Sequence, residues 1–176
     1  DIALQNIQAR SRSPIIWMMT NIQNALLITT SNRSEASVGY ATMDGDTSGS
    51  ISPIAGLDKD YIRKWLVWAE KNLGYSSLSE VNSLNPSAEL RPLNQIQEDE
   101  KDLMPYDILN KIEKLLIHDK KSKNEVLELL KKEFPSQNVE LSLNRFTSLW
   151  QRNQWKRERY APAFHLDDYN VDSRSW

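Results

Sequence analysis

Residues 26–49 read LLITTSNRSEASVGYATMDGDTSG, and this stretch has the pattern of a ligand-binding junction. An apolar run ends in Thr29 and Thr30 and opens into the polar segment 31–35, which predicts a strand, a turn and a helix start. Open α/β sheets bind ligands at the carboxyl ends of their strands, where N-capping residues leave backbone N–H groups facing an anion. Glu35 adds a carboxylate for a metal ion that accompanies the anion. The alternative interpretation is an ordinary helix start, capped by its own side chains.

The composition is that of one globular domain, because 176 residues with 39% hydrophobic and 26% charged side chains suffice for one core. The net charge of −2 implies no bulk attraction to nucleic acid. Cysteine is absent, which excludes disulfides, thiolate metal sites and a cysteine nucleophile. No apolar run approaches the roughly 20 residues of a membrane span, so we expect a cytoplasmic protein without membrane contact.

Helical patterns occupy most of the chain, and residues 25–30 are the best strand candidate. Pro14 should bend or interrupt the first helix, whereas Asp58 should cap a later helix that Gly74 ends. Helices are expected at 6–21, at 34–41, from Asp58 to Leu73, after the caps Asp107 and Ser122, and at about 143–160.

Residues 75–100 have little apolar periodicity and contain Pro86 and Pro92, so we predict a long loop there. Loops of this length in a compact domain are usually functional or disordered. Residues 163–176 also show no periodicity and are expected to form a polar tail.

Phosphate binding through side chains is the most promising chemistry in the sequence. The two histidines lie outside any nucleophile motif, and no Gly-rich phosphate loop is present. Cations and hydroxyls are available instead on Arg10, Thr30, Lys59 and Ser87. Cations neutralise developing phosphoryl charge and hydroxyls orient the oxygens. These four residues form a site only if the fold brings them together, and otherwise they are solvated surface groups.

The segment 150–160, WQRNQWKRERY, mixes four cations with three aromatic residues. One interpretation is a stacking and phosphate-binding surface for a nucleotide or for single-stranded nucleic acid. The other, which we favour for the aromatic residues, is an amphipathic helix with buried rings and solvated cations. Lys156 is the cation of this segment with the best case for ligand binding.

Seven motifs occur in an order that resembles the C-terminal part of the glutamine-dependent NAD⁺ synthetase family, over nearly the whole chain. They are NIQAR at 6–10, TSNRSE at 30–35, GYAT at 39–42 with GD at 45–46, PIAGLDK at 53–59, PSAELRP at 86–92, MPYD at 104–107 and RNQWKR at 152–157. The resemblance implies an α/β parent domain with the Rossmann-like adenine nucleotide alpha-hydrolase (PP-loop ATP pyrophosphatase) fold. Of that fold, this chain would be mostly α-helical with one or two parallel strands.

The resemblance also implies a two-step ligase reaction of NAD⁺ biosynthesis. ATP adenylylates the nicotinate carboxylate of deamido-NAD⁺ and releases pyrophosphate, and ammonia derived from glutamine then displaces AMP. Mg²⁺ neutralises the triphosphate charge. Members of the family are homodimers or larger homo-oligomers, so self-association is expected by resemblance.

Site residues follow from the resemblance, motif by motif. Thr30, Lys59 and Ser87 match positions that contact ATP and are the expected catalytic residues, and Glu35 matches the metal-binding carboxylate. Residues matching positions near deamido-NAD⁺ are Asn6, Arg10, Glu35, Tyr40, Ala41, Thr42, Met43 and Lys156.

Departures from the family pattern concern both single contacts and whole elements. Met43 stands where some members carry lysine, and Ser50 where some carry aspartate. The Ser-Gly-Gly-x-Asp-Ser pyrophosphate loop and the glutaminase domain are missing from the sequence. We therefore expect the distal part of a synthetase domain, inactive in isolation. Its expected parts are a nucleotide-site core at 1–74, an active-site loop at 75–105, a helical subregion at 106–162 and a tail at 163–176.

The alternative function is a non-catalytic helical interaction or nucleotide-binding module descended from such an enzyme. It would use its apolar helix faces to hold a partner chain.

Overall fold

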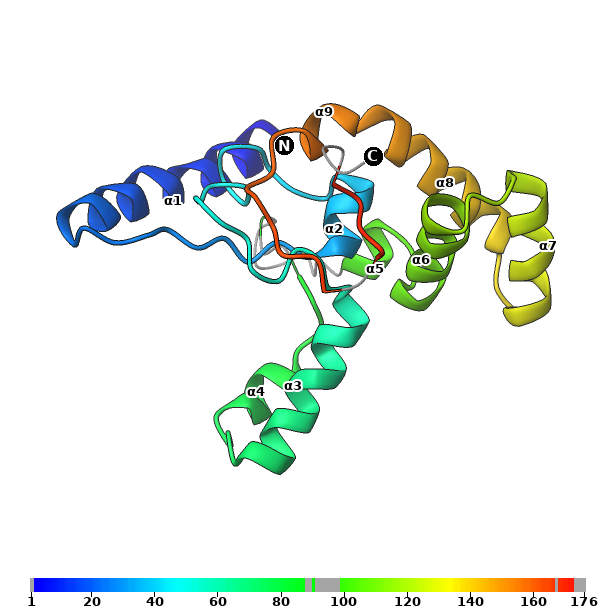
Figure 1. Cartoon of the computed structure of the whole chain (residues 1–176), viewed down its shortest axis with the longest axis horizontal. Helices are drawn as coiled ribbons and strands as arrows, with labels where there is room; N and C mark the ends of the chain where they lie inside the picture. The colour runs from blue at the N-terminus through cyan, green and yellow to red at the C-terminus, as the bar shows by residue number, and fades with distance from the viewer. Residues whose placement is uncertain (1, 88–89, 91–98, 167, 173–176) are drawn as a thin grey trace.

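The computed structural model describes residues 2–87, 90, 99–166 and 168–172, and these are mostly helical, as predicted. Ten helical elements follow one another along the described chain (Figure 1). They are α1 (Ile2–Ile22), α2 (Arg33–Val38), α3 (Lys59–Leu73), α4 (Leu78–Ser83), α5 (Asp99–Asp102), α6 (Tyr106–Glu113), the π-helical turn η1 (Lys114–His118), α7 (Lys123–Glu133), α8 (Val139–Arg152) and α9 (Gln154–Arg157).

The predicted strand at 25–30 is reduced to single pairings in the described part of the chain. Ile28 forms a parallel bridge with Ile51, and Ser52 forms a second parallel bridge with Ala163. Two backbone bonds hold the first pairing, from Thr29 N to Ile51 O at 3.0 Å and from Ser50 N to Leu27 O at 2.8 Å. The expectation of one or two full strands is therefore wrong for these residues, because each extended segment pairs over too few residues to form a ladder.

Helix α2 follows this pairing directly, as the motif at 31–35 predicts. Asn32 is its N-cap, and the Asn32 side chain accepts a hydrogen bond from the Glu35 backbone N–H at 3.0 Å. Gly39 ends the helix with φ of 65°, a left-handed conformation that favours glycine. The helix is shorter than the predicted 34–41 because Gly39 stops it three residues earlier than expected.

Helices α3 and α4 pack against each other and project from the rest of the molecule (Figure 1). The Asp58 side chain caps α3 by accepting from Tyr61 N at 2.7 Å, and Gly74 ends it with φ of 74°, both as predicted. Helix α4 and the start of α5 lie inside the expected long loop, so that prediction is wrong at 78–83 and at 99–100. Residues 88–89 and 91–98 of that loop lie outside the described residues, as does most of the motif at 86–92.

The larger apolar core lies among α6, α7 and α8. The side chains of Ile112, Leu130 and Phe146 are each 0% exposed, and one face of each helix contributes to this cluster. Ser122 and Glu125 form the predicted capping box at the start of α7. This core holds α6 against α2, so it supports the elements around the binding site.

Two helix boundaries near this core differ from the prediction. Helix α6 begins at Tyr106 with Pro105 as N-cap, so Asp107 lies in its first turn rather than at the cap. The expected helix at 143–160 begins earlier, at Val139, and is divided at Asn153 into α8 and α9. At this division the Asn153 side chain donates a hydrogen bond to Val38 O, at the end of α2, at 2.7 Å.

Helix α1 runs as one element through Pro14, so the expected interruption is wrong. Its large apolar side chains are strongly exposed, with Ile7 63% and Ile15 62% accessible. No helix among residues 2–87, 90, 99–166 and 168–172 is long and apolar enough to cross a bilayer.

Candidate functional site

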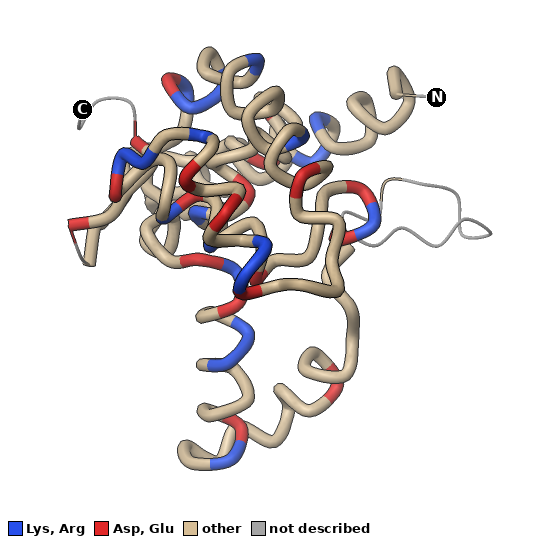
Figure 2. Tube along the Cα trace, turned by 90° about the vertical axis from the view of Figure 1, so that its right-hand side faces the viewer, with Lys and Arg blue, Asp and Glu red and all other residues tan. Residues whose placement is uncertain are grey.

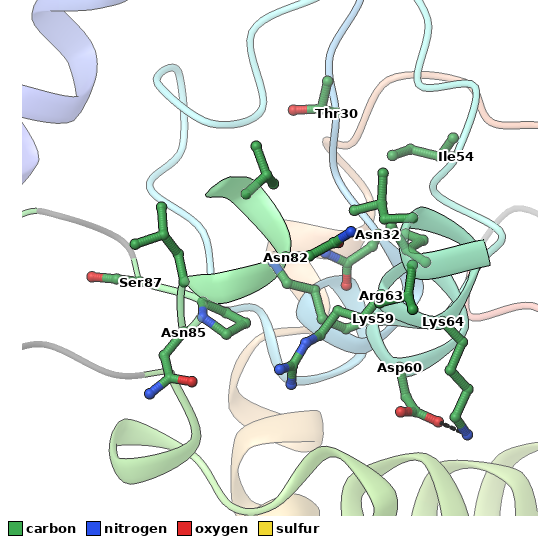
Figure 3. Close-up of a pocket in the computed structure, with 16 residues that line it drawn as sticks. Thr30, Asn32, Ile54, Lys59, Asp60, Arg63, Lys64, Asn82, Asn85 and Ser87 are labelled. Carbon is green, nitrogen blue, oxygen red and sulfur yellow. Dashed lines mark ion pairs between the residues drawn. The ribbon is translucent and has the colours of Figure 1, made fainter. Parts of the chain in front are cut away.

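A pocket of about 690 Å³ brings together three residues that are far apart in the sequence. Thr30 comes from the end of the first extended segment, Lys59 from the first turn of α3, and Ser87 from the chain after α4. Figure 3 shows these side chains around the pocket, carried by three separate segments. The cation of Lys59 and the hydroxyls of Thr30 and Ser87 therefore line one pocket, as a shared binding site requires.

The Lys59 ammonium lies 2.7 Å from the Glu35 carboxylate, and both side chains are about one-fifth exposed, at 23% and 20%. Each residue sits in the first turn of its helix, Lys59 in α3 and Glu35 in α2. The predicted metal carboxylate therefore pairs with the predicted phosphate-binding cation, and of the two only Lys59 lines the pocket.

The rest of this first pocket has an apolar wall and a polar rim. The side chains of Ile62, Leu66 and Val67 come from α3, and Val81 faces them from α4. Polar groups on the rim are Asn32, Asp60, Arg63, Lys64, Asn82 and Asn85. Figure 3 shows the Lys64 side chain directed toward Asp60, with which it forms an ion pair at 2.6 Å. An elongated ligand with an anionic end and an apolar part fits this lining.

A second pocket, of about 430 Å³, contains most of the residues predicted to lie near deamido-NAD⁺. Asn6 of α1, Tyr40, Ala41, Thr42 and Lys156 of α9 all line it. Thr42 Oγ1 donates to Asn6 Oδ1 at 3.4 Å, which links α1 to the turn after α2. Elements from the two ends of the chain thus meet around one cavity.

Lys156 has a structural role in this second pocket as well as an ammonium facing it. Its Nζ donates to Gly39 O at 2.8 Å and to Ala41 O at 2.7 Å, beyond the end of α2. Burial lowers its pKa, while the nearby Asp46 carboxylate opposes that effect. The charge of Lys156 therefore stabilises the turn that forms the pocket wall.

Three predicted residues, Arg10, Glu35 and Met43, line neither of these pockets. Arg10 Nε donates to Met43 O at 2.9 Å, and the Met43 side chain is only 3% exposed. Ser50, the other departure from the family pattern, is exposed, and its backbone N–H pairs with Leu27 O at 2.8 Å. The structure thus brings Arg10 to the backbone of the residue that follows Thr42, which lines the second pocket.

Glu35 is the carboxylate that the sequence predicts for a metal ion. No group of three or more His, Cys, Asp or Glu side chains among the described residues is arranged to hold a metal ion. Mg²⁺ is commonly bound by one or two carboxylates together with substrate phosphates and water. Glu35 is one carboxylate of that kind, and it lies beside Lys59 of the first pocket.

Of the three aromatic residues in segment 150–160, Trp150 and Tyr160 pack against the core, whereas Trp155 is 48% exposed, so the prediction of buried rings is wrong for Trp155. The Arg157 guanidinium lies 3.7 Å from the Trp150 ring centroid, and Arg157 is 2% exposed. Trp150 also stacks on Phe146, with ring centroids 6.1 Å apart. Figure 2 shows Lys and Arg interspersed with Asp and Glu over the described trace. These contacts favour the packing interpretation over a nucleic-acid surface.

Sequence reasoning missed a buried polar cluster beneath the first pocket. Arg33 Nε lies 3.0 Å from the Glu113 carboxylate, and Glu113 is 0% exposed. Burial raises the pKa of Glu113 to about 7, although the Tyr169 hydroxyl and the Arg33 charge act against this rise. The motif at 30–35 includes Arg33, but nothing in the sequence links it to residues 113 and 169.

Comparison with known proteins gives a consistent family assignment. The family model described as NAD synthase matches residues 1–160. A glutamine-dependent NAD(+) synthetase of Aquifex aeolicus is 35% identical over 159 residues, which are 90% of this chain and 26% of that protein. The enzyme of the same name from Xanthomonas campestris pv. campestris is 34% identical, over 93% of this chain and 28% of that protein.

Solved structures agree with these relatives. The crystal structure of a glutamine-dependent NAD(+) synthetase from Cytophaga hutchinsonii matches with a TM-score of 0.84 and 52% identity, over 100% of this chain and 27% of that one. NMN synthetase from Francisella tularensis shares the fold, with a TM-score of 0.63 at 23% identity, over 87% of this chain and 52% of that one. The chain spans about a quarter of the length of its glutamine-dependent relatives. On the family model and these relatives together, the chain belongs to the NAD synthase family.

Proposed function

We propose that this chain forms part of the ATP and deamido-NAD⁺ sites of an enzyme that makes NAD⁺ from deamido-NAD⁺. The observation that carries the proposal is the convergence of Thr30, Lys59 and Ser87 on one pocket. A carboxylate oxygen of deamido-NAD⁺ attacks the α-phosphorus of ATP, and pyrophosphate leaves. Ammonia then attacks the activated carbonyl carbon, a proton is lost, and AMP departs as the amide forms.

The first pocket is proposed to hold the phosphates of ATP. The Lys59 ammonium would neutralise charge that builds on the phosphoryl oxygens, and the hydroxyls of Thr30 and Ser87 would orient those oxygens by hydrogen bonds. The ion pair of Lys59 with Glu35, at 2.7 Å, keeps the ammonium oriented at the rim. Preorganised charge of this kind lowers the barrier because it needs no rearrangement during the reaction.

Glu35 is the residue proposed to hold Mg²⁺, together with the ATP phosphates. When bound, the ion neutralises triphosphate charge and helps pyrophosphate to leave. The support is chemical, since a carboxylate at the rim of a phosphate site is a common protein ligand of Mg²⁺.

The second pocket is proposed to bind deamido-NAD⁺. Asn6, Tyr40 and Thr42 offer hydrogen-bonding groups, and the Lys156 ammonium offers charge for the substrate's phosphates or its carboxylate. Ser87 lines the first pocket, and Leu90, three residues later in the sequence, lines the second. That arrangement suits a reaction in which two substrates meet. Arg10 and Met43 are proposed to act on this site through the backbone of its wall.

Other features of the proposal concern the full-length protein. We propose that the parent domain has the Rossmann-like PP-loop fold, supported by the two parallel bridges. Ammonia is proposed to come from glutamine through a glutaminase domain elsewhere in that protein. We propose a homodimer or larger assembly, which the exposed apolar side chains of α1 favour. The cytoplasmic location stays a prediction.

The test is substitution of Lys59 in the full-length protein, with NAD⁺ formation measured from deamido-NAD⁺, ATP and ammonium chloride. Supplying ammonium directly makes the assay independent of glutamine hydrolysis. Loss of one well-placed group that stabilises charge in the transition state typically costs about 100- to 1000-fold in rate. We expect Lys59→Ala to lose NAD⁺ formation on that scale.

Lys111→Ala is the matched control, because Lys111 also forms an ion pair, with Glu133 at 2.7 Å, but lines neither proposed substrate pocket. It should keep wild-type activity. Near-normal NAD⁺ formation by Lys59→Ala would contradict the proposed function of the first pocket.

A further inference from the structure

The backbone of Lys59 is tied to α2 by a buried hydroxyl. Lys59 N donates to Ser34 Oγ at 3.0 Å, and Ser34 is 0% exposed. Ser34 Oγ in turn donates to Asn110 Oδ1 of α6 at 2.7 Å. The first turn of α3 is therefore fixed to two other helices at the residue that carries the ammonium.

Asp58, the N-cap of α3, joins the same helices from the other side of Lys59. Its Oδ1 accepts from Tyr61 N at 2.7 Å and from Asn110 Nδ2 at 3.1 Å. Its Oδ2 accepts from Arg33 Nη2 at 3.3 Å. One carboxylate thus connects the cap of α3 to α6 and to the first residue of α2.

Arg33 is held in turn by groups from three parts of the chain. Its Nη1 donates to Gly56 O at 2.8 Å and to Tyr169 O at 3.2 Å, and its guanidinium lies 3.9 Å from the Tyr169 ring centroid. The Glu113 carboxylate lies 3.0 Å from Arg33 Nε and accepts from the Tyr169 hydroxyl at 2.5 Å. We call Arg33, Ser34, Asp58, Asn110, Glu113 and Tyr169 the buried network.

We propose that Glu113 is a positioning residue for ATP binding, acting through Arg33 and Asp58 on the ammonium of Lys59. This inference rests on the proposed function of the first pocket. Glu113 touches neither pocket: its effect passes from the Arg33 guanidinium to the cap of α3.

The physical reason is that buried charges fix geometry strongly. Glu113 is 0% and Arg33 6% exposed, so water cannot take the place of a lost partner. Removing one member of a buried ion pair leaves the other without compensation, and it then shifts toward its other partners. Among the partners that Arg33 keeps, Asp58 carries the negative charge, and its movement would shift the first turn of α3 and separate Lys59 from Glu35.

The second pocket provides an internal reference for this mechanism. Its residues come from α1, from the chain after α2, from α5 and α9, and from Leu90, and none belongs to the buried network. A change transmitted through Asp58 should therefore weaken ATP binding and leave deamido-NAD⁺ binding unchanged. A general loss of folded structure would weaken both.

The experiment measures the affinities of the full-length protein for ATP with Mg²⁺ and for deamido-NAD⁺ by titration calorimetry at pH 8.5. The proteins are wild type, Glu113→Gln, Lys59→Ala and the double variant. We expect Glu113→Gln to weaken ATP binding by about 10-fold. Substitution of a residue that orients a binding group commonly has an effect of this size. In the Lys59→Ala background the same substitution should cause no further loss, because both act through one group.

Two further variants complete the design. Glu133→Gln makes the same chemical change in a surface ion pair and should bind ATP as wild type does. Tyr169→Phe removes the hydroxyl that donates to Glu113 but keeps the ring over Arg33, and should cause a smaller loss of ATP affinity. It carries the test if Glu113→Gln does not fold.

Unchanged ATP affinity in both Glu113→Gln and Tyr169→Phe would overturn the inference and leave the proposed function standing. Additive losses in the double variant would overturn it as well. Full ATP affinity in Lys59→Ala would overturn the proposed function, and the inference with it.

Discussion

The carboxyl of Glu113 should titrate near neutral pH, far above an ordinary glutamate. Complete burial raises its pKa from 4.5 to about 7, against the opposing effects of the Tyr169 hydroxyl and the Arg33 charge. One pH unit corresponds to about 1.4 kcal/mol, so ionised Glu113 costs the folded state about 3 kcal/mol. The pKa of Glu113 is higher in the folded state than in the unfolded state. The cost is therefore absent below pH 4.5, grows as the pH rises toward 7, and is complete above pH 7.

The perturbation that tests this reasoning is Tyr169→Phe. The Tyr169 hydroxyl donates to Glu113 Oε1 at 2.5 Å and stabilises the charged form, so its loss should raise the pKa of Glu113 further. The assay is ¹³C NMR of protein labelled at the glutamate side-chain carboxyl, with the Glu113 signal identified by its absence in Glu113→Gln. Titration of wild-type Glu113 near pH 4.5, or a lower pKa in Tyr169→Phe, would refute the argument.

Two further substitutions test the supports of the site. Gly39→Ala should destabilise the fold by about 1–3 kcal/mol, since φ is 65° and a Cβ would lie 2.4 Å from Asn153 Cβ, and the thermal unfolding midpoint should fall. Phe146→Ala should cost about 3–5 kcal/mol because its side chain is 0% exposed, whereas Leu141→Ala, 62% exposed on the same helix, should change the midpoint little. Equal midpoints for the two α8 variants would show that the core was misassigned.

Features that depend on neighbouring residues were predictable from the sequence. The cap of α3 by Asp58, its end at Gly74 and the Ser122 capping box all use groups within a few residues, and the structure contains them. The extent of the strand at 25–30 was not predictable, because a strand forms only where a neighbouring segment pairs with it. In the described chain, residues 25–30 form one bridge, between Ile28 and Ile51.

Site residues divide in the same way. Thr30, Lys59 and Ser87 were selected by residue type and by family resemblance, and their meeting in one pocket required the fold. Arg33 and Glu113 lie 80 positions apart, and no motif near either residue indicates that they pair in the fold. Met43 lies in a family motif, but the motif does not indicate that its side chain is buried.

The central claim is that the pocket of Thr30, Lys59 and Ser87 holds the phosphates of ATP beside a separate deamido-NAD⁺ pocket. A crystal structure of the full-length protein with a non-hydrolysable ATP analogue, Mg²⁺ and deamido-NAD⁺ tests it most directly. We expect triphosphate oxygens within hydrogen-bonding distance of Lys59 Nζ, and the dinucleotide beside Tyr40 and Lys156. A triphosphate bound away from Lys59, with the first pocket empty, would contradict it.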